Sequence, residues 1–341
     1  MRWFVSGGAG FIGANTVRRL LAEGEEVVVF DNLSRPGSEK NLEWLRQAGG
    51  KLTFIRGDVR QAEDVREALA GQTPPDVVLH FAAQVAVTTS VSDPRLDFDI
   101  NAFGTFNVLE AVRGLQLDPV FLFTSTNKVY GALTQYEVVE HPTRYAYAGL
   151  PAGVDEGTPL DFYSPYGCSK GAADQYVRDY HRIFGLRTIV FRNSCIYGTR
   201  QFGIEDQGWL AWFVIAAVLG RPISIYGDGR QVRDVLFVDD LIEAMLRAVR
   251  KPEVTAGQIY NLGGGPDNSL SVWAEFGPLL ERLLGRRVPV EYKEWRPGDQ
   301  KIYISDIRRA RRDLGWSPNV GVEDGIGRLV AWVRDHQSLF G

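Results

Sequence analysis

The sequence has few of the features that mark secreted, membrane-spanning or nucleic-acid-binding proteins. Only two cysteines occur among 341 residues, Cys168 and Cys195, so we expect no disulfide framework and a reducing compartment. The formal net charge of −4 provides no basic field for nucleic acid. The longest apolar run, residues 209–219, is shorter than the ~20 residues that cross a bilayer. No signal-peptide pattern precedes the first apolar segment, and we therefore expect a cytoplasmic protein that binds neither nucleic acid nor membrane.

Histidine is also scarce, and its positions argue against a metal site. The four histidines, His80, His141, His181 and His336, lie far apart and lack the short spacings typical of zinc ligands. We therefore predict that no metal is bound. Hydrophobic residues make up 45% and charged residues 23% of the chain, which is an ordinary globular balance. A chain of this length can bury a full core without disulfides.

The first half of the sequence alternates between short apolar runs and amphipathic stretches. The expected strands are residues 3–5, 27–30, 52–55, 77–80, 120–124 and 188–191. The expected helices are residues 12–22, 39–47, 62–69, 95–113 and 169–184. Strands that alternate with helices of this length predict βαβ units and a parallel sheet. The predicted fold class is therefore α/β, a Rossmann doubly wound sheet of at least six or seven strands with helices on both faces.

The pattern loosens after about residue 197. Clusters of glycine and proline there alternate with single expected helices at 239–249 and 272–284. We therefore expect a dinucleotide-binding domain over residues 1–190 and a smaller mixed α/β substrate lobe over 191–341. A strand or helix from residues 230–262 is available to return to the first domain.

A glycine-rich loop, SGGAGFIG at residues 6–13, follows the first expected strand and opens the first expected helix. It satisfies G-x-G-x-x-G through positions 8, 10 and 13, and G-x-x-G-x-x-G through positions 7, 10 and 13. Glycines in this setting permit a tight turn and bring a pyrophosphate close to the N–H groups of a helix N-terminus. A dinucleotide cofactor is therefore predicted, and the alternative is a glycine turn without a ligand. The expected contacts are Gly7, Gly10, Phe11 and Ile12.

Asp31 ends the second expected strand, where a carboxylate can accept both hydroxyls of an adenosine ribose. Its charge would repel a 2′-phosphate, which favours NAD over NADP. Arg35 is the one feature in favour of NADP, and we interpret it as a surface residue or an adenine neighbour. Asp58 and Val59 follow the third expected strand, at the position where an adenine would be flanked. Capping of the next helix is a second, compatible role for Asp58.

Tyr166 and Lys170 are spaced one helical turn apart, so they share a face. A phenol with its ordinary pKa of ~10 is a poor base, but a nearby ammonium group and a positive nicotinamide ring would lower that pKa. The phenolate could then take a proton from a sugar hydroxyl while a hydride leaves for the cofactor. Thr126 lies at the carboxyl end of the fifth expected strand and could share the hydrogen bond to the reacting oxygen; the alternative is a turn-forming threonine. The predicted catalytic residues are Thr126, Tyr166 and Lys170.

These features together resemble the extended short-chain dehydrogenase/reductase family, the NAD-dependent epimerases and dehydratases of nucleotide sugars. Matching strings are HFAA at 80–83, INAFGT at 100–105, YGDGRQVRD at 226–234 and RPGD at 296–299. The resemblance implies arginine contacts to a diphosphate from Arg233 and Arg296, because a guanidinium can bind phosphate oxygens bidentately. It also implies that residues 191–341 bind the nucleotide sugar. Further implied cofactor contacts are Asn32, Ser34, Arg35, Phe81, Ala82, Ala83, Asn101, Tyr166 and Lys170.

Longer strings are similar to one subgroup of that family, the 2-epimerases of CDP-paratose and CDP-tyvelose. They are TNKVYG at 126–131, SPYGCSKGAADQY at 164–176, RQF at 200–202, DQGW at 206–209, DNLSR at 31–35 and QVA at 84–86. The resemblance implies inversion at C2 of a CDP-linked hexose, paratose/tyvelose or glucose/mannose, through transient oxidation to a 2-keto sugar and return of the hydride. The implied substrate contacts are Gln84, Thr126, Asn127, Lys128, Asn193, Gln207, Trp209, Tyr226, Gln231, Arg233, Arg296 and Asp299.

The chain departs from relatives at two places. RNSC at 192–195 differs from the family's pattern, and Cys195 stands where many relatives carry a phosphate-binding asparagine. The dehydratases carry an Asp-Glu pair after the threonine, but Asn127 and Lys128 stand here, which disfavours dehydration. A C4 epimerase of the UDP-galactose type shares every catalytic residue and remains an alternative, as does a nucleotide-binding protein without turnover. The resemblance further implies a homodimer or homotetramer, formed through helices 95–113 and 169–184.

Overall fold

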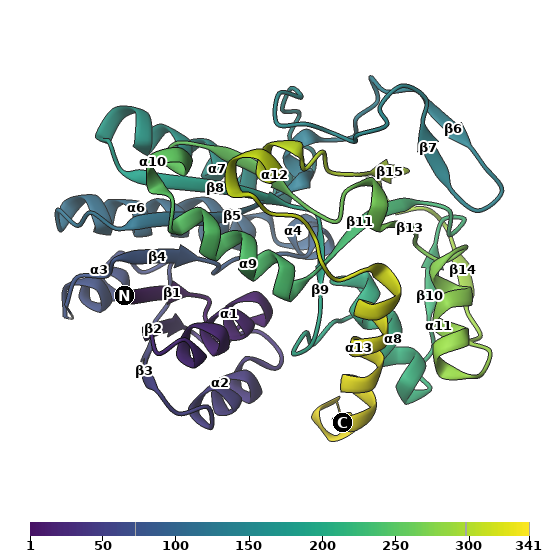
Figure 1. Cartoon of the computed structure of the whole chain (residues 1–341), viewed down its shortest axis with the longest axis horizontal. Coiled ribbons are helices and arrows are strands. Elements are labelled where there is room, and N and C mark those ends of the chain that lie inside the picture. The colour runs from purple at the N-terminus through teal and green to yellow at the C-terminus, as the bar shows by residue number, and fades with distance from the viewer. Residues whose placement is uncertain (72, 297–298, 341) are drawn as a thin grey trace. The chain divides into compact units, whose positions relative to one another are not determined.

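The computed structural model describes residues 1–71, 73–296 and 299–340, which form two compact units (Figure 1). The first unit comprises Met1–Val129, Ser164–Arg192 and Ile242–Tyr260. The second unit comprises Tyr130–Tyr163, Asn193–Leu241 and Asn261–Gly341.

This division differs from the expected boundary at residue 190 in the placement of residues 130–163, whereas the segment that returns to the first unit lies within the range 230–262 that the sequence made available. Residues 130–163 belong to the second unit, because Tyr130 donates to Asn261 at 2.7 Å and Val154 forms a β-bridge with Ser305. Residues 242–260 return to the first unit and add a strand to its sheet.

The first unit is built on a seven-stranded sheet in the order β12-β8-β5-β4-β1-β2-β3. The strands are β1 (Arg2–Ser6), β2 (Glu26–Asp31), β3 (Lys51–Arg56), β4 (Val77–His80), β5 (Val120–Thr126), β8 (Arg187–Asn193) and β12 (Ile259–Leu262). The pairs β1–β2, β2–β3, β1–β4 and β4–β5 are parallel. The expected strands are all present, and the doubly wound fold is confirmed. The strand order reverses between β1 and β4, which is the point where such sheets bind ligands.

Helices flank this sheet because parallel strands require crossover connections, which are right-handed. They are α1 (Phe11–Ala22), α2 (Ser38–Arg46), α3 (Ala62–Ala70), α4 (Val87–Ser92), α6 (Gly104–Gly114), α7 (Ser164–Phe184), α9 (Val238–Val249) and α10 (Pro252–Thr255). Helices α1 and α2 pack together, and α6 packs against both α3 and α7. One core cluster joins alternate residues of the strands, such as Phe4, Phe121 and Phe123, to Val65 of α3 and Val177 of α7. This core holds the carboxyl ends of the strands in place.

Residues 95–113 do not form the single regular helix that the sequence predicts. The segment is divided into α5 (Pro94–Phe98), a π-helical turn η1 (Asp99–Phe103) and α6. Asp93 caps α5 by accepting from the Leu96 N–H at 3.0 Å. Within the π turn, the Thr105 hydroxyl donates to the Asn101 carbonyl at 2.6 Å, and a hydroxyl bonded to the helix backbone in this way disturbs regular α-helix.

The second unit contains smaller sheets and helices. Its elements are β6 (Val138–Glu140), β7 (Tyr145–Tyr147), β9 (Cys195–Tyr197), α8 (Trp209–Leu219), β10 (Ser224–Tyr226), β11 (Val232–Phe237), η3 (Pro266–Asn268), β13 (Ser269–Ser271), α11 (Phe276–Leu284), β14 (Glu291–Lys293), β15 (Ile302–Tyr303), α12 (Arg308–Leu314), α13 (Val322–Asp335) and η4 (Gln337–Phe340). Strand β11 pairs with β9, β13 and β15, and β10 pairs with β14. Strands β6 and β7 form an antiparallel hairpin. A short 3₁₀ turn, η2 (Asn127–Tyr130), follows β5.

The helix expected over residues 272–284 begins later, at Phe276. The N–H groups of Val272 and Trp273 donate to the carbonyls of Gln231 and Gly229, so these residues are held by the neighbouring loop. Ser271 and Glu275 exchange reciprocal side-chain-to-backbone hydrogen bonds at 2.8 Å, which fixes the start of α11.

No helix among the described residues is long and apolar enough to cross a membrane. Helix α8 carries the longest apolar run, but it has 11 residues.

A buried ion pair joins α7 to β8 in the first unit. Arg192 binds Asp174 with two hydrogen bonds of 2.9 Å, and both side chains are buried. Replacing Arg192→Met should lower the free energy of unfolding by about 3–5 kcal/mol, because the Asp174 carboxylate would remain buried without a counter-charge. Chemical denaturation measures this loss. The double variant R192M/D174N is the control and should recover most of it; an equal loss in both would contradict the account.

Candidate active site

The glycine-rich loop between β1 and α1 is tightly packed against itself. A Cβ on Gly13 would lie 2.2 Å from the Gly7 carbonyl oxygen, so only glycine permits this approach of helix to loop. Gly10 caps α1, and a Cβ there would meet only the Gly7 oxygen, at 3.2 Å. The backbone before Phe11 and Ile12 is therefore open toward the first N–H groups of α1. These groups have no partner within the helix, which suits a diphosphate.

Asp31, at the end of β2, is 8% exposed and ties this loop to the sheet. One carboxylate oxygen accepts from the Ala9 N–H at 3.0 Å, and the other accepts from the Leu33 N–H at 2.8 Å. Burial raises the pKa of Asp31, and these two hydrogen bonds oppose the rise. Each oxygen retains a lone pair for a hydroxyl donor, so the carboxylate fits a ribose diol.

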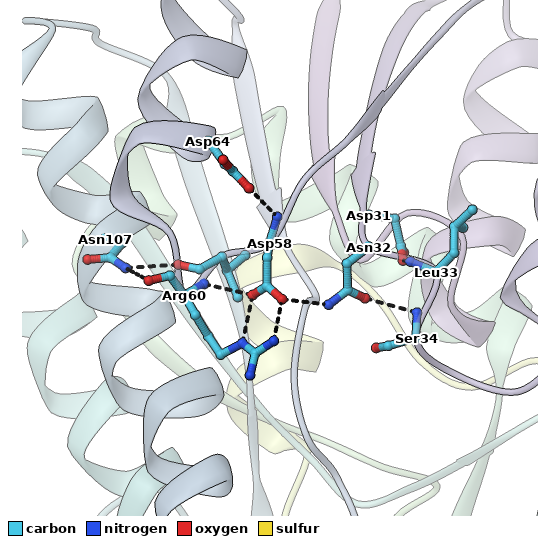
Figure 2. A network of polar contacts seen from close by, with 9 residues as sticks. Asp31, Asn32, Leu33, Ser34, Asp58, Arg60, Asp64 and Asn107 are labelled. Carbon is cyan, nitrogen blue, oxygen red and sulfur yellow. Dashed lines mark hydrogen bonds and ion pairs between the residues drawn. The ribbon is translucent and has the colours of Figure 1, made fainter.

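Asp58 is the centre of a polar network at the end of β3, as Figure 2 shows. Its carboxylate accepts from Arg60 Nε at 3.0 Å and Nη2 at 2.7 Å, and from Asn32 Nδ2 at 2.9 Å. Burial alone would raise the pKa of Asp58, but these donors bring it to about 2. The N-cap of α3 is Gln61, so capping of that helix is not the role of Asp58. The network links the loops after β2 and β3.

The segment after β4 begins with a buried histidine that is structural. His80 Nδ1 lies 2.6 Å from the Ser6 hydroxyl, and Nε2 lies 3.0 Å from the Thr105 hydroxyl. Burial lowers the pKa of His80 to about 3, so the imidazole is neutral. Phe81, Ala82 and Ala83 follow it, half-buried at the carboxyl edge of the sheet.

Tyr166 lies in the first turn of α7, and its hydroxyl is hydrogen-bonded to Thr126 at the end of β5. The structure therefore brings together two of the residues that the sequence places 40 positions apart. The pKa of Tyr166 is raised to about 12, chiefly by burial and also by the charge of Asp97, while the Thr126 hydrogen bond and the charge of Arg35 oppose the rise.

Arg35 is half-buried, which differs from the expected surface position. Its pKa is lowered by burial and raised by the charge of Tyr166, so it lies toward the catalytic residues.

Lys170, one turn after Tyr166 on α7, is almost fully buried. Its Nζ donates to the Thr124 carbonyl at 2.7 Å and lies 4.2 Å from the centre of the Phe123 ring. Burial lowers the pKa of Lys170 to about 7, against the charges of Asp174 and Asp97. The lowering of the Tyr166 pKa that the sequence predicts from Lys170 is not observed. The ammonium group is directed onto β5.

Four buried polar side chains connect the catalytic helix to the segments beside it. Asp97 accepts from Ser169 Oγ at 2.5 Å, from Gln84 Nε2 at 2.8 Å and from Asn101 Nδ2 at 3.1 Å. Asn101 also bonds both backbone groups of Gln84 at 3.0 Å. The amide of Gln84 is further bonded to the backbone of Ala86, so this expected substrate contact is already engaged. Sequence analysis missed Asp97, which is the one buried residue of α5 and belongs to none of the motifs.

Residues after β5 include the pair that separates epimerases from dehydratases. Asn127 is buried and Lys128 half-buried, and both lie in the turn η2 that follows Thr126. Thr126 Oγ1 lies 3.3 Å from Asn127 Oδ1, and it accepts a hydrogen bond of 3.3 Å from the backbone N–H of Lys128. The Ser125 hydroxyl is buried without a hydrogen-bond partner in the described part of the chain, which indicates that a further polar group belongs at this edge.

The two arginines expected on a diphosphate are both paired with carboxylates in the second unit. Arg233, on β11, donates to Asp299 at 2.7 Å. Arg296 donates to Asp206 at 2.8 Å, and its guanidinium carbon lies 3.8 Å from the centre of the Tyr226 ring. Pro297 and Gly298, which belong to the same expected motif, lie outside the described residues. A diphosphate would have to compete with these carboxylates.

Several expected substrate contacts of the second unit have unsatisfied amide oxygens. The Oδ1 of Asn193 and the Oε1 atoms of Gln207 and Gln231 are buried without a partner among the residues that the structure describes. A buried acceptor without a donor is costly, so these oxygens indicate a ligand that donates hydrogen bonds. Trp209 Nε1 donates to Cys195 Sγ at 3.3 Å, so Cys195 has a packing partner. No group of three His, Cys, Asp or Glu side chains in the described ranges could hold a metal ion.

The sequence matches known proteins over almost its whole length. A family model described as GDP-mannose 4,6 dehydratase matches residues 4–329. A CDP-paratose 2-epimerase from Salmonella typhi is 44% identical over 337 residues, which cover 97% of this chain and 99% of that protein.

Solved structures of related enzymes also superpose well. A UDP-glucose 4-epimerase from Thermotoga maritima with UDP-glucose has a TM-score of 0.85 and 31% identity, covering 99% of this chain and 100% of that one. A dTDP-glucose 4,6-dehydratase from Streptomyces venezuelae with NAD bound has a TM-score of 0.85 and 31% identity, covering 99% of this chain and 98% of that one.

Proposed function

We propose a function from one premise, that the chain belongs to the extended short-chain dehydrogenase/reductase family, with the nucleotide-sugar epimerases and dehydratases. Within that family it is a nucleotide-sugar epimerase, and its cofactor is NAD. The glycine loop, the open backbone before α1 and the Asp31 carboxylate fit that dinucleotide. The proposed reaction is inversion at C2 of a CDP-linked hexose, of the CDP-paratose/CDP-tyvelose type, without net oxidation or reduction.

One observation carries the choice of epimerisation over dehydration. Thr126 is followed by Asn127 and Lys128, so neither neighbour can act as the carboxylic acid that expels a sugar hydroxyl. Asp97 is the nearby carboxylate on α5, but it is 0% exposed and its oxygens accept three side-chain hydrogen bonds. The described site therefore offers a proton-transfer group, Tyr166, without a second acid for elimination. The likeness to CDP-paratose 2-epimerase supports C2 as the reacting carbon.

The chain's own residues divide the work of the proposed reaction. Tyr166 takes the proton from the C2 hydroxyl and later returns it, while Thr126 holds the same oxygen through its hydroxyl. Lys170, one turn after Tyr166 on α7, would bind hydroxyls of the nicotinamide ribose. A bound NAD would supply hydride transfer from and to C2, and its nicotinamide charge would favour the phenolate. A raised pKa of about 12 keeps Tyr166 protonated until such charge is present.

Inversion requires that the planar keto sugar present its other face before the hydride returns. Binding energy should therefore act on the nucleotide and diphosphate rather than on the hexose. Arg233 and Arg296 would serve this role by exchanging Asp299 and Asp206 for phosphate oxygens. The unsatisfied oxygens of Gln207 and Gln231 would accept hydrogen bonds from the nucleotide sugar.

A second candidate is a C4 epimerase. The structural likeness to a UDP-glucose 4-epimerase favours it, and it would use Thr126, Tyr166 and Lys170 in the same roles. The two candidates differ in the carbon that is inverted, so the position of inversion decides between them. A non-catalytic nucleotide-binding role would leave Tyr166 and Lys170 unused.

The cofactor should be recovered as NAD when the purified protein is denatured, because release during turnover would strand a keto sugar. Separation of the released nucleotides by chromatography provides the measurement. NAD should predominate because the Asp31 carboxylate is buried at the ribose position and would repel a 2′-phosphate. Recovery of mainly NADP would contradict the role given to Asp31.

Replacing Tyr166→Phe should lower kcat by about 10²–10⁴-fold, because the proton-transfer group is lost while the ring is kept. NAD content, measured on the same preparation, should stay near that of the unmodified protein. Tyr176→Phe removes an exposed hydroxyl from the same helix and should leave kcat unchanged. Near-normal turnover by the Tyr166 variant would show that another group moves the proton.

Self-association is also proposed, because α7 and the turn η1 expose apolar side chains. Phe103, Tyr176, Ile183 and Phe184 are all between 44% and 66% exposed. A two-fold contact would bury this face, and we expect a dimer or tetramer, with the tetramer favoured. Light scattering at micromolar concentration should give that mass, and Tyr176→Asp should reduce it. Val254→Asp, at an exposed apolar residue outside these helices, is the control; a monomeric unmodified protein would refute the assembly.

The fate of the C2 hydrogen tests the proposed reaction most directly. A CDP-hexose deuterated at C2 should give a product inverted at C2 that still carries deuterium there, because the hydrogen leaves and returns within the site. The unlabelled substrate in heavy water should acquire no deuterium at C2. NMR of both products provides the measurement. Solvent deuterium at C2 would make Tyr166 a carbon base, and inversion at C4 with C2 untouched would establish the C4 epimerase instead.

A further inference from the structure

Asp97 is a fully buried carboxylate whose hydrogen-bond donors are all neutral. Ser169, Gln84 and Asn101 donate to it over 2.5–3.1 Å, and the side chain is 0% exposed. Neutral donors offset part of the cost of burying a charge, but a counter-charge is needed for the remainder. The negative charge of Asp97 therefore requires a cation nearby.

In the part of the chain that the structure describes, the buried charges around α7 include one direct ion pair. Arg192 binds Asp174 through two hydrogen bonds of 2.9 Å, so these two charges balance each other. His80 faces the same region from β4 but is neutral, because burial lowers its pKa to about 3. Arg35, from the loop after β2, acts on Tyr166. Lys170 and Asp97 are left as the remaining opposite charges.

Among the described residues, the direct contacts of Lys170 are with uncharged groups. Its Nζ donates to the Thr124 carbonyl and lies over the Phe123 ring, and a buried ammonium group with such neighbours tends to lose its proton. The charge of Asp97 opposes this loss, as the charge of Asp174 does. Asp174 has the larger effect of the two on Lys170 but is paired directly with Arg192, whereas the side-chain donors to Asp97 are neutral.

We propose that Asp97 is a positioning residue that keeps Lys170 in its ammonium form and fixes the start of the catalytic helix through Ser169. The Ser169 hydroxyl bonds both Asp97 and the Tyr166 carbonyl, so one carboxylate acts on the two catalytic residues of α7. Through Gln84 and Asn101 the same carboxylate also holds the loop after β4 and the π turn. The role in turnover rests on the proposed function, whereas the charge relation to Lys170 does not.

The negative charge of Asp97 should shift two pKa values in one direction, which a purely structural role would not do. Asp97 raises the pKa of both Lys170 and Tyr166. Its neutral isostere in Asp97→Asn should therefore let both pKa values fall, and the pH profile of kcat should move to lower pH. Loss of packing alone would lower kcat without moving the profile.

The first test is a lysine NMR titration of the full-length protein as purified. The sequence contains seven lysines, so selective ¹³C,¹⁵N-lysine labelling gives few signals, and Lys170→Met identifies the signal of Lys170. Its midpoint should lie near pH 7 in the unmodified protein and about one pH unit lower in Asp97→Asn. Ser169→Ala removes one hydrogen bond to Asp97 but keeps its charge, and should leave the midpoint in place. An unchanged midpoint in Asp97→Asn would overturn the proposal.

A double-mutant cycle keeps the proposal testable if Asp97→Asn folds poorly. Thermal unfolding would be measured for Asp97→Asn, Lys170→Met and the double variant. Opposite buried charges should couple, so the double variant should unfold at a higher temperature than the sum of the two single shifts predicts. Additive shifts would overturn the proposal. Neither experiment needs a sugar substrate, so failure of the epimerase assignment would be recognised separately, by the absence of C2 inversion in the unmodified protein.

Discussion

Parallel strands can be joined only by crossovers, and this constraint brings the functional segments of the first unit to one edge of the sheet. The glycine loop follows β1, Asp31 ends β2 and Asp58 follows β3. The HFAA segment follows β4, and Thr126 ends β5. Hydrogen bonds then join neighbouring loops, from Asp31 to the glycine loop and from Asn32 to Asp58 (Figure 2). The clustering of these loops at the carboxyl edge of the sheet is therefore a consequence of the order in which the strands are connected.

Burial acts in opposite directions on the two ionisable groups of the catalytic helix. It raises the pKa of Tyr166 to about 12 and lowers that of Lys170 to about 7, and in both cases it disfavours the charged form. A phenol in such a setting does not ionise by itself at neutral pH. The same low-polarity setting makes any charge that enters the site more effective, which explains why a few fixed carboxylates and arginines can govern the chemistry.

Much of this organisation follows from the sequence because it depends on local pattern. The alternation of apolar runs with amphipathic stretches predicts the strands β1 to β5 and β8 closely, and the spacing of Tyr166 and Lys170 predicts their common helix face. Features that depend on distant partners were not predictable. The later start of α11 results from hydrogen bonds to residues 229–231, and the amide of Gln84 is engaged by Asp97 on α5. The π turn within 95–113 carries Asn101, whose side chain bonds Ser169 of α7.

The same limit applies to charge. Sequence spacing suggests that Lys170 acts directly on Tyr166, but the structure directs Nζ onto the Thr124 carbonyl. It also pairs the expected phosphate-binding residues Arg233 and Arg296 with Asp299 and Asp206. Long side chains reach several partners from one backbone position, so their partners depend on tertiary packing. Residue type and position could be predicted, whereas the pairing could not.

The π turn η1 has a consequence for the alignment of side chains along its helix. Residues four apart in a regular α-helix drift by about 40° around the axis, because each turn takes 3.6 residues. Asp97, Asn101 and Thr105 have this spacing, so a regular helix would rotate Thr105 by about 80° relative to Asp97. The wider π turn between them unwinds the helix, and all three make buried contacts, with Ser169, Gln84 and His80 respectively. One extra residue in a single turn thus offsets the rotation that accumulates between side chains four residues apart, and these polar groups stay aligned along the helix.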